Sequence, residues 1–161
     1  MRRRFFLAAL CLLFFIPCMN VNYLSIRHGE EVLCAAPVSF GAPFETSYVH
    51  SVQLTPVIDE YRILGGRIWS WEERVQSHNA GLPFDAPQHG RFLVKSPWMI
   101  VQGGRVATTN IPYRVGTDSL GQNRWSLPPF AELLAYEAYP RYRVDIGIST
   151  ERLFRAKVTG W

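Results

Sequence analysis

Beyond residue 28, apolar residues mostly recur at every second position, which is the period of a half-buried β-strand. Gly65-Gly66 and Gly103-Gly104 each separate two such runs, and this predicts two β-hairpins. The runs are Phe44–Val52, Val57–Leu64, Arg67–Ser77, Trp98–Gln102, Arg105–Thr109, Ile111–Val115, Arg124–Leu127 and Tyr142–Ile148. The pattern predicts a mainly β fold, a single antiparallel β-sandwich or partly open barrel.

One segment has helical spacing instead. Pro128-Pro129 is suited to begin a helix, and the following stretch FAELLAYEAY carries apolar residues at 130, 133, 134 and 138. Pro140 would end it. We expect one short helix that covers an end of the β scaffold.

The N-terminus has the composition of an export segment. Three arginines, Arg2–Arg4, precede the apolar run FFLAALCLLFFIPCM. As a helix, Phe5–Val21 would reach roughly 25 Å, slightly less than the ~30 Å hydrocarbon core of a bilayer. Tyr23, Leu24 and Ile26 would complete the span, with Tyr23 at the interface.

This pattern divides the chain in two. Residues 1–27 are predicted to be a cytoplasmic arginine cluster and a transmembrane signal anchor, and residues 28–161 an extracytoplasmic β-rich domain. The protein would cross the bacterial cytoplasmic membrane once, with its N-terminus inside and its domain in the periplasm or outside.

Two alternatives to the anchor stay open. A cleaved signal peptide needs small residues before its cleavage site, and Cys34-Ala35-Ala36 is far from the apolar run. A lipoprotein site at Cys18 would follow Pro17 rather than a small residue. All three alternatives export the domain.

Charge and cysteines exclude several functions. The net charge of +4 includes the three N-terminal arginines, so the predicted domain is nearly neutral. It shows no basic stripe with interleaved aromatics, and we expect no nucleic-acid binding. Cys34 is the one cysteine beyond the apolar segment, so we expect a small buried hydrophobic residue there and no disulfide.

Several polar residues stand on predicted strands. Regular alternation places His50 on the face of Phe44 and Tyr48, either as a core histidine or as a pocket histidine. Glu73 interrupts an apolar face, which a β-bulge would explain by turning it outward. By the same alternation, Glu72 is expected to be an exposed strand residue. Glu60 points away from the apolar face of its own strand.

The stretch SHNAGLPFDAPQHG follows these strands. Its first part, from Ser77 to Gly81, is polar and prone to turns, and Pro83 and Pro87 restrict the loop that follows. Loops of this composition on a rigid scaffold often bind ligands, although any long connection can look alike.

An ordered series of short motifs spans about residues 44–84. It comprises Tyr48-Val49-His50-Ser51-Val52, then Pro56-Val57 with Glu60, then Glu72, then Ser77 and Ala80-Gly81-Leu82-Pro83. This series resembles the family called domain of unknown function 1850. Asn79 stands where that family usually has glycine, and Gln53 where an acidic residue is common.

The resemblance implies a role but no activity. Members look like small exported proteins encoded beside tripartite ATP-independent periplasmic (TRAP) transporters of the TAXI class. It therefore implies an accessory role in solute uptake, with a TRAP membrane subunit or a TAXI solute-binding protein as partner. It also favours Glu72 over Glu73 as the functional glutamate.

These observations favour a non-enzymatic accessory or binding protein without a cofactor. The candidate surface comprises His50, Ser51, Glu60, Glu72, Glu73, Ser77, Asn79, Ala80, Gly81, Leu82 and Pro83. A small hydrolase is an alternative, although adjacent strand residues such as His50 and Ser51 point to opposite faces. A metal site using His50, His78, His89 and the glutamates matches no standard spacing. A purely structural polar network is the fourth hypothesis.

Overall fold

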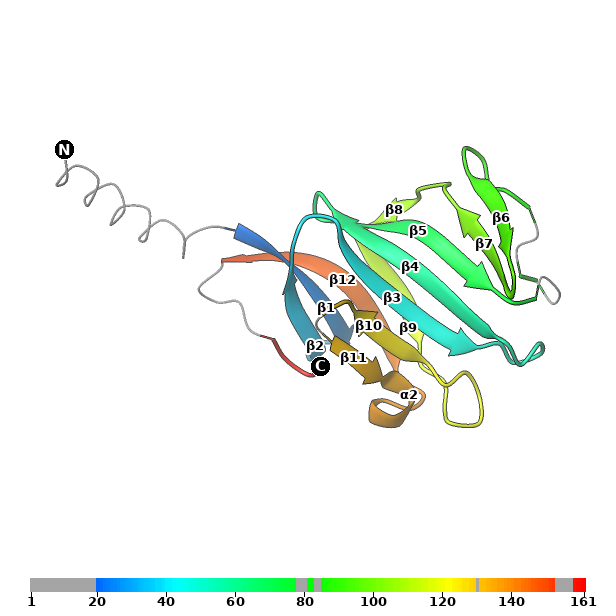
Figure 1. The fold of residues 1–161 in the computed structure, drawn as a ribbon. Coiled ribbons are helices and arrows are strands. Elements are labelled where there is room, and N and C mark those ends of the chain that lie inside the picture. Colours follow the sequence, from blue (N-terminus) through cyan, green and yellow to red (C-terminus); the bar gives the residue numbers. More distant parts are fainter. Residues whose placement is uncertain (1–19, 78–80, 83–84, 130, 153–157) are drawn as a thin grey trace, which may run out of the picture.

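Two antiparallel sheets packed face to face make up the fold (Figure 1). The computed structural model describes residues 20–77, 81–82, 85–129, 131–152 and 158–161. The small sheet has the strand order β2 (Glu31–Val38), β1 (Asn20–His28), β12 (Arg143–Arg152) and β9 (Asn110–Arg114). Among these residues, the predicted mainly β, antiparallel fold with one short helix is confirmed.

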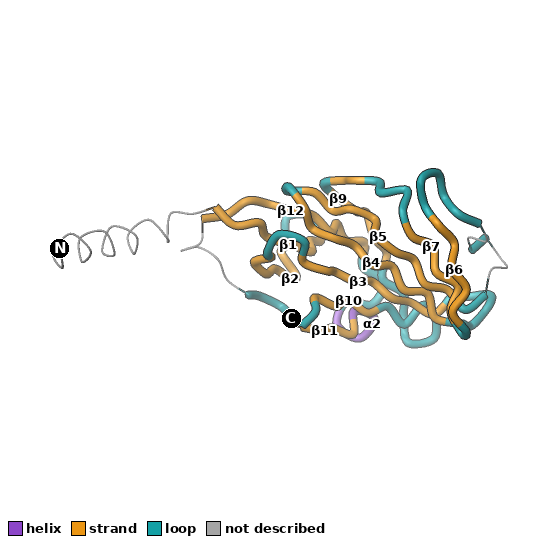
Figure 2. The backbone as a smooth tube through the Cα atoms, turned by 45° about the horizontal axis from the view of Figure 1, so that its top comes forward, coloured by secondary structure: helices purple, strands orange, loops and turns teal. Residues whose placement is uncertain are grey.

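The large sheet carries the remaining strands. Its order is β11 (Ala131–Leu134), β10 (Arg124–Leu127), β3 (Ala42–Val49), β4 (Pro56–Leu64), β5 (Arg67–Val75), β7 (Trp98–Gln102) and β6 (Arg91–Lys95). The short strand β8 (Ala107–Thr108) pairs with the first part of β5. Figure 2 shows the β6–β7 hairpin at the end of the large sheet, beyond the small sheet.

Period-two alternation builds the core between the sheets. Leu24 and Ile146 from the small sheet meet Phe44, Ile63 and other residues of the large sheet, and all four are fully buried. Burial of large aliphatic and aromatic side chains is the main stabilising contribution in such a sandwich. Cys34 belongs to this core, donates its thiol to the Gly160 carbonyl at 3.1 Å and has a pKa raised to about 11 by burial. It is the small buried residue that the sequence predicts.

The first strand begins inside the segment that hydropathy assigns to the membrane. Residues 20–28 form β1 at the centre of the small sheet, between β2 and β12. The side chains of Leu24 and Ile26 are fully buried in the sandwich core. Residues 1–19 lie outside the described residues, and no helix among those described is long and apolar enough to cross a membrane.

One glycine-pair prediction is confirmed and the other is wrong. Gly65 and Gly66 both adopt positive φ, as a type I′ turn requires, and connect β4 to β5. Gly103-Gly104 does not connect a hairpin, because β7 and β8 both pair with β5, one after the other. The hairpin partner of β7 is β6, which precedes it.

The predicted helix is shorter than expected. Ala131–Leu134 pairs with β10 as strand β11, and only Ala135–Ala138 is helical, as α2. Helical spacing is a weak indicator over so few residues, and the open edge of β10 provides backbone partners for the segment.

Replacing Ile63 with alanine tests the core. Ile63 is fully buried between the sheets, so Ile63→Ala should lower the free energy of unfolding by about 2–5 kcal/mol through lost burial and a residual cavity. Chemical denaturation measures the change. The matched control is Val94→Ala on strand β6, where the side chain is 73% exposed and the expected change is within about 0.5 kcal/mol. Equal losses for the two variants would contradict this core.

Candidate functional site

A β-bulge in strand β5 determines where the charged residues lie. Tyr61 pairs with Ser70, whereas its neighbour Glu60 pairs with Glu72, so Trp71 has no partner on β4. Before the bulge, Ile68 lies on the inner face of the large sheet, and after it Glu73 and Val75 lie on that same face. The bulge therefore places Glu72 on the outer face of the large sheet and Glu73 on the inner face. The expectation that a bulge turns Glu73 outward is wrong.

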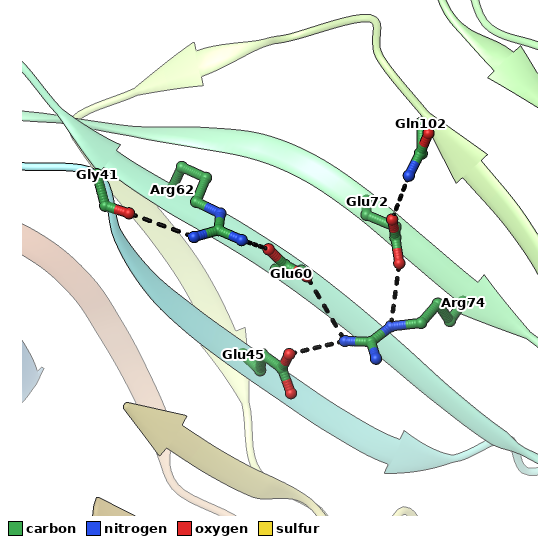
Figure 3. A network of polar contacts seen from close by, with 7 residues as sticks. All are labelled: Gly41, Glu45, Glu60, Arg62, Glu72, Arg74 and Gln102. Carbon is green, nitrogen blue, oxygen red and sulfur yellow. Dashed lines mark hydrogen bonds and ion pairs between the residues drawn. The ribbon is translucent and has the colours of Figure 1, made fainter. Parts of the chain in front are cut away.

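Arg74 is the centre of a polar network on the outer face (Figure 3). Its Nη2 donates to Glu45 Oε1 at 2.7 Å and lies 3.7 Å from Glu60 Oε2. Its Nε lies 3.4 Å from Glu72 Oε1. One guanidinium thus joins carboxylates from strands β3, β4 and β5.

Two further side chains extend this network. Arg62 forms an ion pair with Glu60 and donates to the Gly41 carbonyl at 3.4 Å, and Gln102 on β7 donates to Glu72. The Glu60 and Glu72 side chains are only 12% and 15% exposed, although no part of the small sheet covers them. We call Glu45, Glu60, Arg62, Glu72, Arg74 and Gln102 the outer-face network.

A hollow of about 420 Å³ continues this face toward β10 and β11. Its walls include Glu45 of the outer-face network, the Ile58 side chain, and the ion pair of Arg124 with Glu132 at 3.4 Å. The outer face therefore combines fixed charges with a partly apolar depression.

The inner face of the same strands carries a second pair of acids. Asp59 and Glu73 are register partners on β4 and β5 and face the interior between the sheets. Burial raises the pKa of Asp59 to about 6. Burial, and then the neighbouring Asp59 charge, raise the pKa of Glu73 to about 7. The inner face thus holds two desolvated carboxyls opposite each other.

Hydroxyl groups surround this pair. Burial raises the pKa of Tyr113 to about 12 and raises that of Tyr48 and of Tyr61 above the ordinary tyrosine value. Thr46 is fully buried, and its hydroxyl is close enough to Asp59 to lower its pKa, but makes no hydrogen bond of ordinary geometry with the described residues.

His50 is not on the core face. Strand β3 ends at Val49, and the His50 Nδ1 accepts the backbone N–H groups of Val52 and Gln53, each at 3.2 Å. The side chain thus stabilises the 50–55 turn, where Leu54 adopts positive φ. This Nδ1 is therefore not free to act as a base, and Ser51 is exposed beside it.

The other predicted residues are dispersed. Ser77 donates to the Gln53 amide oxygen at 2.9 Å and so lies at the same end of the sandwich as His50. Leu82 is buried with Val57 and Val75 in a small second core, and Gly81 is exposed with positive φ. Asn79, Ala80, Pro83 and His78 lie outside the described residues.

The predicted residues therefore do not converge on one site. His50, Ser51 and Ser77 lie at one end of the sandwich, Glu60 and Glu72 on the outer face, and Glu73 on the inner face. Within the described part of the chain, no three His, Cys, Asp or Glu side chains are placed to hold a metal ion.

Sequence reasoning missed five residues of the outer-face network and the inner acid pair, namely Glu45, Asp59, Arg62, Arg74 and Gln102. Arg74 shares the alternating face of Glu72, and Asp59 shares that of Val57 and Tyr61. Strand alternation alone assigns both residues to these faces, so a search for charged residues on each face would have found them. Gln102 is different, because its contact with Glu72 depends on how β7 pairs with β5.

Residues 44–128 match the family model described as domain of unknown function (DUF1850). The match covers strands β3 to β10, and with them both faces of β4 and β5. It extends over more than half of the chain. The chain belongs to this family. Comparisons with curated proteins and with solved structures gave no match.

The inner acid pair predicts a pH dependence of stability in this DUF1850 protein. Both pKa values are higher in the folded chain than their ordinary values of 3.8 and 4.5, so the folded state binds more protons than the unfolded state between about pH 4 and pH 7. The contribution of this pair to the free energy of unfolding is largest below about pH 4 and is lost as the pH rises through 7. Glu73→Gln should stabilise the fold by about 1–2 kcal/mol at pH 8 and change little at pH 4.

Denaturation of Glu73→Gln and wild type at several pH values measures this difference. The control is Glu151→Gln, an exposed residue of β12, for which the difference should be small at every pH. A Glu73→Gln difference that does not vary with pH would contradict a desolvated carboxyl pair.

Two substitutions test the role of His50. His50→Ala removes the acceptor for two backbone N–H groups and should cost about 1 kcal/mol of stability. His50→Asn retains an acceptor that can close the same kind of turn, so it should recover much of that loss. Thermal denaturation compares them. Equal stability of His50→Ala and wild type would show that the turn does not depend on this ring.

Proposed function

We propose that this protein is a membrane-anchored extracytoplasmic accessory or binding protein that serves TAXI-type TRAP solute uptake and binds its partner through the outer face of the large sheet. The partner is a TRAP membrane subunit or a TAXI solute-binding protein. The anchor in this proposal is confined to residues 1–19, because residues 20–28 form β1.

The observation that carries the proposal is the outer-face network. Arg74 joins Glu45, Glu60 and Glu72 from three strands, and all four side chains point away from the small sheet (Figure 3). Two of these acids, Glu60 and Glu72, belong to the motifs that characterise the family resemblance.

Stability alone is a weak reason for such a network. Ion pairs at a protein surface contribute little, with a median of about 0–1 kcal/mol, and holding several charges at low exposure adds a desolvation cost. A fixed array of charges is well suited to orient a partner of complementary charge and to exclude others. Its low exposure reduces the further desolvation that docking requires.

The remaining hypotheses have less support. A hydrolase built on Ser51 needs a free histidine base, and the Nδ1 of His50 is occupied by two backbone N–H groups. The link to TAXI-type transport is supported by the family resemblance, and the surface argument is independent of which transporter subunit binds.

Neutralising one acid of the network should weaken partner binding. Glu72→Gln removes the charge but retains a side chain that can hydrogen-bond Gln102, so the domain should stay folded. We expect roughly tenfold less partner captured and a corresponding fall in solute uptake. Affinity capture of the tagged full-length protein from its native envelope, followed by identification of the captured subunits, measures the first effect.

The control is Glu151→Gln, which makes the same charge change on the small sheet. It should capture the transporter subunit as wild type does. Capture that is unchanged in Glu72→Gln, or that brings down no transporter subunit with the wild type, would contradict the proposal.

A further inference from the structure

The β-bulge of β5 lies opposite the break between β7 and β8, the two strands that pair with the other edge of β5. On β5, Trp71 is the unpaired residue of the bulge. On the other side, Gln102 pairs with Glu72 and the Val106 carbonyl accepts the Ser70 N–H at 2.9 Å, so residues 103–105 are left opposite Trp71. The sheet is thus open at this point between β7 and β8.

A pocket of about 320 Å³ lies beside this opening, since Trp71, Gly103 and Arg105 line it. It lies on the outer face beside the outer-face network, since Gln102 belongs to both. The side chains that line it are Trp71, His89, Arg91, Gln102 and Arg105. The bulge is what aims Trp71 into this space.

The lining is rich in donors and has no acid. In the described part of the chain, Arg91 and Arg105 form no ion pair, and the Trp71 indole N–H makes no hydrogen bond. Arg105 and Arg62 both lie over the Trp71 ring, with their Cζ atoms 5.0 Å and 5.8 Å from the ring centroid. The nearest acid of the network, Glu72, is held by Gln102 and Arg74.

Two glycines of the lining are tightly packed. Gly90 and Gly103 pack backbone against backbone, so that a Cβ at Gly103 would lie 2.4 Å from the Gly90 Cα. A Cβ at Gly90 would lie 2.3 Å from the Gln102 carbonyl oxygen. Only glycine fits at either position, and this contact holds His89, in the loop before β6, and Arg91, at the start of β6, against the end of β7.

We propose that this pocket is a binding site for a small carboxylate, held by Arg91 and Arg105 and lying against Trp71. Guanidinium groups match the geometry of a carboxylate and form stronger hydrogen bonds with it than with a neutral group. Trp71 lines the same space beside these arginines, and the volume suits a small organic acid. The site adds a ligand to the proposed function and does not rest on it.

Benzoate and its neutral analogue benzamide provide a matched pair of probes. We expect benzoate to bind the purified full-length protein in detergent at a single site and to change its tryptophan fluorescence. Benzamide should bind at least roughly tenfold more weakly, because it lacks the charge. Isothermal titration calorimetry measures both affinities, and inorganic phosphate tests whether any oxyanion suffices.

Arg91→Gln and Arg105→Gln should each weaken benzoate binding roughly tenfold. Arg143→Gln, the same change on the small sheet, should leave it unaltered. In Trp71→Phe the fluorescence response should disappear. Wild-type affinity in both pocket variants, equal binding of benzamide, tighter binding of phosphate than of benzoate, or no binding at millimolar benzoate would each overturn the proposal.

Discussion

The register of β4 against β5 is the constraint on which the rest of the structure depends. A single bulge at Trp71 shifts this register within the pair, so that Glu60 faces Glu72 on one side of the sheet and Asp59 faces Glu73 on the other. Because strand side chains alternate, a shift of one residue exchanges the two faces of everything that follows. The bulge thereby separates the outer-face network from the inner acid pair, and it opens the sheet beside Trp71.

The two groups of acids have different environments. Arg74 and Arg62 form ion pairs with the outer carboxylates at low exposure. The inner pair has tyrosine and threonine neighbours, and no arginine of the described residues forms an ion pair with it, so burial raises the pKa of both carboxyls. The register explains why these two acids are buried at a cost in desolvation. Val57, Ile63 and Val75 lie on the same face and are fully buried, so Asp59 and Glu73 are buried with them.

Much of the fold could be predicted from the sequence. Alternation gave the strands around Trp98–Gln102 and Arg124–Leu127 with their observed bounds, and Gly65-Gly66 gave the β4–β5 hairpin. The pairing of β7 with β5 could not be predicted, because Gly103-Gly104 has the sequence of a hairpin turn. In the structure the chain does not turn back there, and β7 and β8 pair with β5 one after the other. The start of β1 was missed because Leu24 and Ile26 follow an apolar run directly, so hydropathy merges the strand with that run.

The candidate site was predictable only in part. Glu60 and Glu72 could be found from the sequence, but their partner Arg74 was missed. His50 stood out by type, yet its role depends on where β3 ends, and residue type does not show that. The pocket beside Trp71 needs two irregularities from separate strands to lie opposite each other, which is a property of the tertiary pairing.

NMR spectroscopy of the isotopically labelled protein tests the register most directly. Cross-strand contacts between backbone protons report which residues of β4 and β5 are opposite each other. The account predicts contacts of Asp59 with Glu73 and of Glu60 with Glu72, and none that pair Trp71 with a residue of β4. Contacts of Asp59 with Glu72 and of Glu60 with Trp71 would mean a hairpin without a bulge, and would contradict the account.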